Sequence, residues 1–158
     1  MSYLTVSNLA KRFGDSLILD ELSFTIEKGE FVTLLGSSGC GKSTLLRCIA
    51  GLTQPDSGYI QVDNENITFA PAQHRGIGMV FQSYALFPNM TVEANIAFGL
   101  NLRKMDKGLV QQKVRQAIAR VELQGKEKNM PHELSGGQRQ RVALARALVM
   151  EPRILLLD

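Results

Sequence analysis

Residues 36–44 read GSSGCGKST, and this stretch decides the fold. It fits the pattern G-x-x-x-x-G-K-[ST], which forms a phosphate-binding loop where a buried strand precedes it and a helix follows it. The apolar run FVTLLG at 31–36 predicts that strand, and STLLRCIAG at 43–51 predicts a helix that ends at Gly51. A glycine-rich turn that binds nothing would not require the lysine and hydroxyl residues, so the context favours a phosphate site.

Each part of this loop suits a triphosphate. Backbone N–H groups can surround phosphate oxygens only where glycine permits the necessary dihedral angles. Lys42 would place a positive charge at the terminal phosphates, and Ser43 would offer its hydroxyl to Mg²⁺ at a helix N-terminus. We therefore expect a nucleotide bound by Gly36, Ser37, Ser38, Gly39, Cys40, Gly41, Lys42, Ser43 and Thr44.

The remaining sequence predicts strands first and helices in the middle. The alternating stretches YLTVSNL at 3–9 and LSFTIE at 22–27 indicate half-buried antiparallel strands, and strands are also expected within 55–63 and 76–82. Apolar residues then recur at helical spacing, so residues from about 86 to 134 are expected to form an inserted helical subdomain. Its signals are Thr91 as an N-cap and the row Val110, Val114, Ala117 and Val121.

The final residues, ILLLD, predict a buried parallel strand that ends in Asp158. A phosphate-loop site commonly takes its second Mg²⁺ contact from an aspartate at the end of another buried strand. Any buried strand can end in an acid, so the assignment of Asp158 as a metal ligand depends on the strength of the loop at 36–44.

The stretch LSGGQRQRVALARAL at 134–148 predicts a second anion-binding helix N-terminus. Ser135 can cap a helix that runs through Val149, but capping alone does not explain the two glycines and the glutamine that follow it. A compact domain with one nucleotide has no evident use for two phosphate sites.

Over its whole length the sequence resembles the ATP-binding subunits of ABC transporters. GSSGCGKST resembles their Walker A loop, LSGGQ their signature motif and ILLLD their Walker B strand. The resemblance implies an α/β P-loop ATPase core over 1–158, with an N-terminal antiparallel β subdomain. It also implies ATP and Mg²⁺ as cofactors, with Lys42, Gln82 and Asp158 as catalytic residues and Ser43, Gln82 and Asp158 around the metal.

The resemblance implies further contacts and partners. Phe13 matches the aromatic residue that stacks on adenine in the family, although a lone Phe near a turn is more often a core residue. Two subunits of the family face each other head to tail, so that ATP would also contact Ser135, Gly136, Gly137 and Gln138 of the second subunit. The segment from Gln82 to about Phe98 would face the membrane permease, and GIGMVFQSYALFPNMTVEANIAFGL is most similar to importers of the maltose, polyamine, ferric-iron and phosphonate group.

Composition limits the other classes of function. The net charge is +3 and acids are interleaved with bases, which gives little support for nucleic-acid binding. We expect no direct membrane insertion, a peripheral location at the cytoplasmic face of the membrane, and no disulfide framework from the two cysteines. The sequence leaves open a non-catalytic ATP-binding or interaction module. A P-loop kinase or GTPase is disfavoured because LSGGQ has no role there.

The sequence departs from the family after Asp158. The family places a catalytic glutamate next, and then a switch histidine, the rest of the core sheet and, in this importer group, a regulatory domain. We therefore expect a fragment that binds nucleotide but does not hydrolyse it at a transporter-like rate. The family's strand between FVTLLG and ILLLD is also absent, which would leave these two apolar segments without their shared neighbour.

Overall fold

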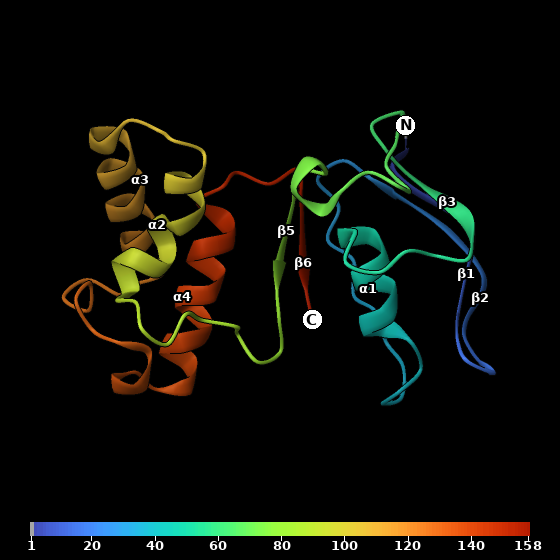
Figure 1. Ribbon diagram of the computed structural model, residues 1–158, viewed down its shortest axis with the longest axis horizontal. Coiled ribbons are helices and arrows are strands. Elements are labelled where there is room, and N and C mark those ends of the chain that lie inside the picture. Colours follow the sequence, from blue (N-terminus) through green and yellow to red (C-terminus); the bar gives the residue numbers. More distant parts are fainter. Residues whose placement is uncertain (1) are drawn as a thin grey trace. The chain divides into compact units, whose positions relative to one another are not determined.

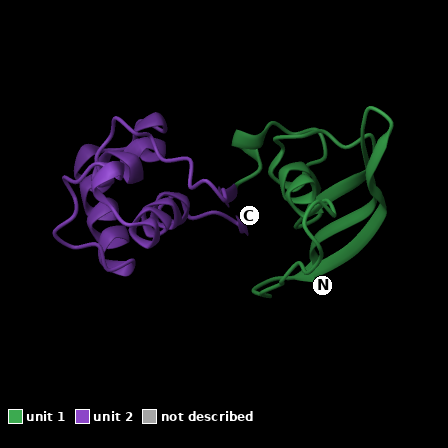
Figure 2. Ribbon diagram, turned by 90° about the horizontal axis from the view of Figure 1, so that it is seen from below, with its two compact units in different colours: residues 1–76 green, residues 77–158 purple. Residues whose placement is uncertain are grey.

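The computed structural model describes residues 2–158 and divides into two compact units, Met1–Gly76 and Ile77–Asp158. Figure 2 colours the first unit green and the second purple. In the described residues, the first unit combines an antiparallel sheet with one α-helix and a short 3-10 helix, and the second combines a parallel strand pair with three α-helices and a short 3-10 helix. The expected α/β class is confirmed.

The sheet of the first unit has four strands in the order β2-β1-β3-β4. The strands are β1 (Ser2–Phe13), β2 (Ser16–Glu27), β3 (Ser57–Val62) and β4 (Glu65–Asn66), and each pairing is antiparallel (Figure 1). Side chains alternate across the long strands, as the sequence predicts, and the buried face contains Leu4, Val6, Leu9, Leu19, Ile60 and Val62.

Helix α1 (Lys42–Ala50) follows the loop at 36–44 and ends where the sequence predicts. Gly51 adopts a left-handed φ of 82°, and its N–H donates to the Cys48 carbonyl. The helix buries Leu45, Leu46, Cys48, Ile49 and Ala50. The short 3-10 helix η1 (Ala72–His74) comes near the end of the unit.

The strand expected at 31–36 is not formed, and this prediction was wrong. Residues 30–37 carry no regular secondary structure, and the side chains of Phe31 and Leu35 are 86% and 90% exposed. A strand requires a hydrogen-bonded neighbour, and neither of the two sheets in the described residues includes this segment. Its apolar character therefore does not bring it into the core.

The second unit begins with β5 (Ile77–Val80), which pairs in parallel with β6 (Ile154–Leu157). Between them lie α2 (Val92–Leu102), α3 (Lys107–Arg120), the 3-10 turn η2 (Pro131–Glu133) and α4 (Gly136–Leu148). Thr91 caps α2 by accepting a hydrogen bond from the Ala94 N–H, as expected.

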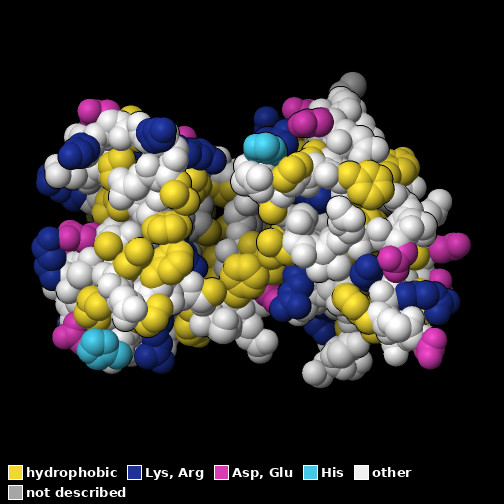
Figure 3. Space-filling model, viewed as in Figure 1, with side chains coloured by type: hydrophobic (Ala, Val, Ile, Leu, Met, Phe, Trp, Pro, Cys, Tyr) yellow, Lys and Arg dark blue, Asp and Glu magenta, His cyan; other side chains and the backbone are white. Residues whose placement is uncertain are grey.

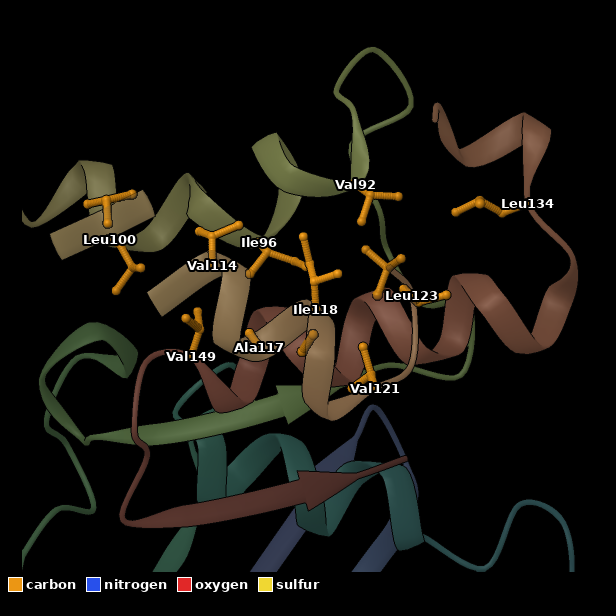
Figure 4. Packing of buried hydrophobic residues seen from close by; sticks show 13 residues of the cluster. Val92, Ile96, Leu100, Val114, Ala117, Ile118, Val121, Leu123, Leu134 and Val149 are labelled. Carbon is orange, nitrogen blue, oxygen red and sulfur yellow. The ribbon is translucent and has the colours of Figure 1, made fainter. Parts of the chain in front are cut away.

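The helices of this unit pack around one apolar cluster, shown as sticks in Figure 4. The predicted row on α3 supplies Val110, Val114 and Ala117, all of which are buried. Val142 and Ala145 of α4 belong to the same cluster. The limits of a helical subdomain at about 86–134 stay a prediction, and the packing core itself extends into α4.

The strand at the end of the chain is parallel, as predicted, but it is less buried than predicted. Only Leu156 of β6 is buried, and Leu157 is 54% exposed. The physical reason is that β6 pairs with β5 alone in the described residues, so much of this two-stranded ribbon lacks a covering neighbour.

Candidate functional site

The loop at 36–44 turns twice through dihedral angles that favour glycine. Gly39 and Gly41 have φ values of +80° and +96°. At Gly41 the space is also restricted, because a Cβ there would lie 2.9 Å from the Ile18 carbonyl oxygen of β2. This glycine therefore lets the loop approach the β1–β2 hairpin closely before α1 begins.

Lys42 turns its side chain back over the loop. Its Nζ donates to the carbonyl oxygens of Gly36 and Ser37 at 2.7 and 2.8 Å and lies 3.3 Å from the Cys40 Sγ. One ammonium group is thus held in the middle of the loop, with a positive charge available to an anion there.

The helix that follows the loop is suited to an anion as well. The first turn of α1 contains no acidic residue, and its N-cap, Gly41, has no side chain that could cap it. The N-terminal N–H groups of a helix carry partial positive charge. The loop residues from Gly36 to Cys40 are exposed to solvent. The residues present therefore fit a phosphate group.

Phe13 lies at the end of β1, where it pairs with Ser16 across the hairpin, and its side chain is 53% exposed. The Lys11 ammonium lies 5.3 Å from the centre of the Phe13 ring. Lys11 also forms an ion pair with Asp56 at 3.0 Å. The Phe13 ring is therefore available for stacking. It belongs to the same β1–β2 hairpin as Ile18, whose carbonyl oxygen lies next to Gly41 of the loop.

Asp56 fixes the backbone next to this ring. Its Oδ2 accepts a hydrogen bond from the Arg12 N–H at 2.6 Å, and the Asp56 N–H donates to the Ala10 carbonyl at 2.9 Å. The Arg12 N–H, together with the Lys11 ammonium, lowers the pKa of the Asp56 carboxyl. The carboxylate therefore holds the strand residues just before Phe13.

Gln82 and Asp158 lie in the second unit and line the same cavity of about 380 Å³. Gln82 comes two residues after β5, and Asp158 comes directly after β6, where its N–H donates to the Val80 carbonyl at 3.0 Å. The parallel pairing of the two strands brings these residues to one end of the ribbon. The cavity wall also includes Gln140 and Leu144 of α4.

Ser135 and Gln138 form a reciprocal cap at the start of α4. The Ser135 Oγ accepts a hydrogen bond from the Gln138 N–H at 3.2 Å, and the Gln138 Oε1 accepts one from the Ser135 N–H at 2.9 Å. Gly136 and Gly137 lie between them in the first turn, and a Cβ at either position would meet nothing within 4 Å. Packing within the described residues therefore does not require glycine here.

The predicted site residues are thus divided between the two units. The loop at 36–44 and Phe13 belong to the first unit, whereas Gln82, Asp158 and the Ser135 turn belong to the second. Sequence reasoning missed three side chains, namely Asp56 described above, and Asn95 and Arg146, which hydrogen-bond to backbone carbonyls of the loop after β5. For Asn95 and Arg146 the available signal was a polar residue within a largely apolar stretch, such as the arginine of VALARAL, whereas Asp56 lies in the polar turn TQPDSG and gave no such signal.

Comparison with known proteins agrees with these features. A family profile described as ABC transporter matches residues 19–158. No helix in the described part of the chain is long and apolar enough to cross a membrane.

Individual relatives match nearly the whole chain. The sequence is 47% identical over 157 residues to the Fe(3+) ions import ATP-binding protein FbpC of Escherichia coli O157:H7, which covers 99% of this chain and 45% of that protein. It is 50% identical over 155 residues to the spermidine/putrescine import ATP-binding protein PotA of Marinobacter nauticus, covering 98% and 42%. The chain thus spans less than half the length of these relatives.

A solved structure supports the same assignment. The structure of cbiO1 from Clostridium perfringens, part of the ABC transporter complex cbiONQ, matches with a TM-score of 0.88 and 34% sequence identity. The match covers 100% of this chain and 66% of that one. With the phosphate loop and the family profile, these similarities establish that the chain belongs to the ABC transporter family.

Proposed function

We propose that this chain is the nucleotide-binding part of a subunit that couples ATP binding and hydrolysis to the import of a solute. The observation that carries the proposal is the loop at 36–44, in which Lys42 is held at the centre and an uncapped helix N-terminus follows. The relatives in iron and polyamine import support a role in import. The transported solute would be selected by other subunits.

In this proposal Lys42 binds the terminal phosphates and Ser43, Gln82 and Asp158 surround Mg²⁺. Magnesium prefers oxygen ligands, and these side chains offer a hydroxyl, an amide carbonyl and a carboxylate. The metal would neutralise charge on the phosphates. Phe13 would stack on adenine, and the remaining residues of the 36–44 loop would donate N–H groups to phosphate oxygens.

We further propose that a second copy of this subunit completes the site head to tail. Glycine within a helix costs about 1 kcal/mol relative to alanine, so two adjacent glycines without a packing role are unfavourable for α4 by itself. A close approach of this turn to a phosphate held by another subunit would explain Gly136 and Gly137. Ser135 and Gln138 would contribute to the same contact. The other partners would be the membrane permease subunits, which would place the protein at the membrane surface.

Binding of Mg-ATP to the purified chain tests the proposal. By calorimetry, Lys42→Ala should weaken binding by about 1.5 to 3 kcal/mol, which is about 10- to 150-fold, because a charge-assisted contact is lost. Lys107→Ala removes an exposed lysine at the start of α3 and should leave the affinity unchanged. Equal affinities of the Lys42 variant and the parent chain would refute the phosphate site.

A further inference from the structure

Arg146 of helix α4 holds the loop that follows β5. Its Nη1 donates to the Ala85 carbonyl at 2.9 Å and its Nη2 donates to the Tyr84 carbonyl at 3.0 Å. The guanidinium carbon also lies 5.5 Å from the centre of the Phe87 ring. One side chain of α4 therefore makes three contacts with residues 84–87.

The backbone at these contacts adopts an unfavourable conformation. Tyr84 and Ala85 have φ values of 63° and 48°, so two consecutive residues that are not glycine occupy the left-handed region. Side chains with a Cβ rarely adopt this conformation without support from the surrounding structure. The paired hydrogen bonds from Arg146 to these two carbonyls supply such support.

A second side chain fixes the other end of the same loop. Asn95 of α2 is fully buried, accepts a hydrogen bond from the Phe87 N–H at 2.9 Å, and donates to the carbonyls of Phe87 and Met90 at 3.2 and 3.0 Å. The Phe87 ring also packs against Phe98 of α2, with 4.5 Å between ring centres. The hydrogen bonds of Asn95 reach Phe87 and Met90, whereas those of Arg146 reach Tyr84 and Ala85, nearer to Gln82 in the sequence.

We infer that Arg146 is a positioning residue, which sets the conformation of loop 81–90 and thereby the place of Gln82 relative to Asp158. Because Arg146 belongs to α4, its contacts join the loop that follows Gln82 to the helix that begins after Ser135. The consequence for metal binding rests on the proposed function, in which Gln82 is a ligand. The conformational part of the inference does not depend on that role.

The chemistry of arginine explains why this position would not accept a lysine equally well. The planar guanidinium can donate to two neighbouring carbonyls and stack on a ring at the same time. A lysine ammonium is a point charge on a flexible stem. Arg146→Lys should therefore loosen the loop in part, whereas Arg146→Met should loosen it fully.

Amide hydrogen exchange of the purified chain separates a positioning role from a general role in stability. In Arg146→Met, we expect exchange at the amide of Tyr84 to accelerate at least tenfold, because Arg146 binds the carbonyls of Tyr84 and Ala85. The α3 amides of Val114 and Ile118 should be unchanged, and the amide of Phe87, which donates to Asn95, should change less than that of Tyr84. Arg146→Lys should give a smaller acceleration of exchange in the loop, again without a change in α3. This variant tests the inference if Arg146→Met does not fold.

A matched control is available on the same helix. Arg139 lies about two turns earlier and donates to the Leu134 carbonyl at 3.2 Å. Arg139→Met should leave exchange in loop 81–90 unchanged. Unchanged loop exchange in both Arg146 variants, or an equal acceleration in α3, would overturn the inference.

A binding measurement tests the consequence for Gln82. Affinity for ATP is measured with Mg²⁺ and with the metal removed by EDTA, for the parent chain, Gln82→Ala and Arg146→Met. We expect both variants to lose affinity several-fold with Mg²⁺ and to match the parent without it. A loss in Gln82→Ala alone would overturn the link between Arg146 and Gln82. No loss in Gln82→Ala would instead remove the proposed metal role of Gln82, and the exchange result would still decide whether Arg146 positions the loop.

Discussion

At the scale of single residues, the loop at 36–44 is organised around its own lysine. The Lys42 ammonium donates to two loop carbonyls, which ties this side chain to the backbone of the loop. The exposed Cys40 lies next to it, whereas Cys48 is fully buried in α1. Burial raises the pKa of the Cys48 thiol, which lowers the fraction of reactive thiolate there. The reactivity of Cys40 therefore reports on the loop at 36–44, and the reactivity of Cys48 reports on the packing of α1.

The first prediction concerns these thiols. A maleimide should label Cys40 quickly and Cys48 only after unfolding, because Cys48 is both buried and protonated. Saturating Mg-ATP should slow labelling of Cys40, since the bound phosphates would cover the loop. The rates can be followed by mass spectrometry of the two peptides. Equal rates at Cys40 with and without nucleotide would place the nucleotide elsewhere.

At the scale of elements, helix α1 is held at its C-terminal end by a buried arginine. Arg75 is 1% exposed and donates to the carbonyls of Cys48 and Ile49, at 2.9 and 3.0 Å, and to those of Ala70 and Thr68. The cation meets the negative end of the helix dipole. Gly51 leaves the space that Arg75 occupies, because a Cβ there would lie 2.4 Å from the Arg75 Nε.

Gly51→Ala should consequently destabilise the chain more than the same change at Gly29. Both glycines have nearly the same φ, +82° and +81°, but a Cβ at Gly29 would meet nothing within 4 Å. The left-handed conformation costs alanine about 1 to 2 kcal/mol at either site. Displacing Arg75 from its carbonyls should add about 1 to 3 kcal/mol at Gly51. Urea denaturation measures the free energy of unfolding of each variant. Equal losses of stability in Gly51→Ala and Gly29→Ala would mean that Arg75 moves aside without cost.

The edge between β1 and β3 should give a measurable pH dependence. The folded state lowers the pKa of Asp56, chiefly through the Arg12 N–H and the Lys11 side chain. A lowered pKa stabilises the fold above the unfolded value of about 3.9, and this stabilisation is lost as the pH falls further and Asp56 is protonated. Asp56→Asn should therefore be less stable than the parent chain at pH 7 and equally stable well below pH 4. Thermal unfolding of both chains across this pH range measures whether their stabilities converge. A difference in stability that persists well below pH 4 would contradict the prediction.

At the scale of the whole molecule, apolar side chains reach the surface of both units, as the yellow atoms of Figure 3 show. Four exposed apolar side chains lie close together in the sequence, namely Phe31, Val32, Leu34 and Leu35. Exposed apolar side chains that gather in one segment are typical of an interface or of a segment that associates with other chains. A single exposed apolar residue such as Leu102 does not indicate an interface.

The chain should therefore bind a hydrophobic dye and scatter light at high concentration. The double variant Phe31→Ser, Leu35→Ser should reduce both signals, since it removes two of the most exposed apolar side chains. Leu102→Ser removes one isolated apolar side chain, which is 70% exposed, and should change them little. Equal effects of the two variants would show that the segment at 31–35 is not the source.

Local signals in the sequence determined the elements whose stability is local. The limits of α1, the caps at Thr91 and Ser135, and the buried row on α3 follow from helix periodicity and capping. The expectation that capping leaves Gln138 unexplained was wrong, because the Gln138 side chain accepts a hydrogen bond from the Ser135 N–H. The parallel direction of β6 follows from the helices that separate it from β5. The family also followed from the sequence, because its glycines and lysine occur at fixed spacing within one loop.

Only the tertiary structure decided what depends on a neighbour that is remote in sequence. The run at 31–36 has the composition of a buried strand, but burial and pairing require a partner strand, and the described sheets provide none. In the same way, nothing near Arg146 in the sequence indicates Tyr84 and Ala85, since a polar side chain can satisfy any carbonyl that the fold brings within reach. The sequence determines local conformation and the chemistry of the loop, whereas pairing and long-range hydrogen bonds arise only when distant segments meet.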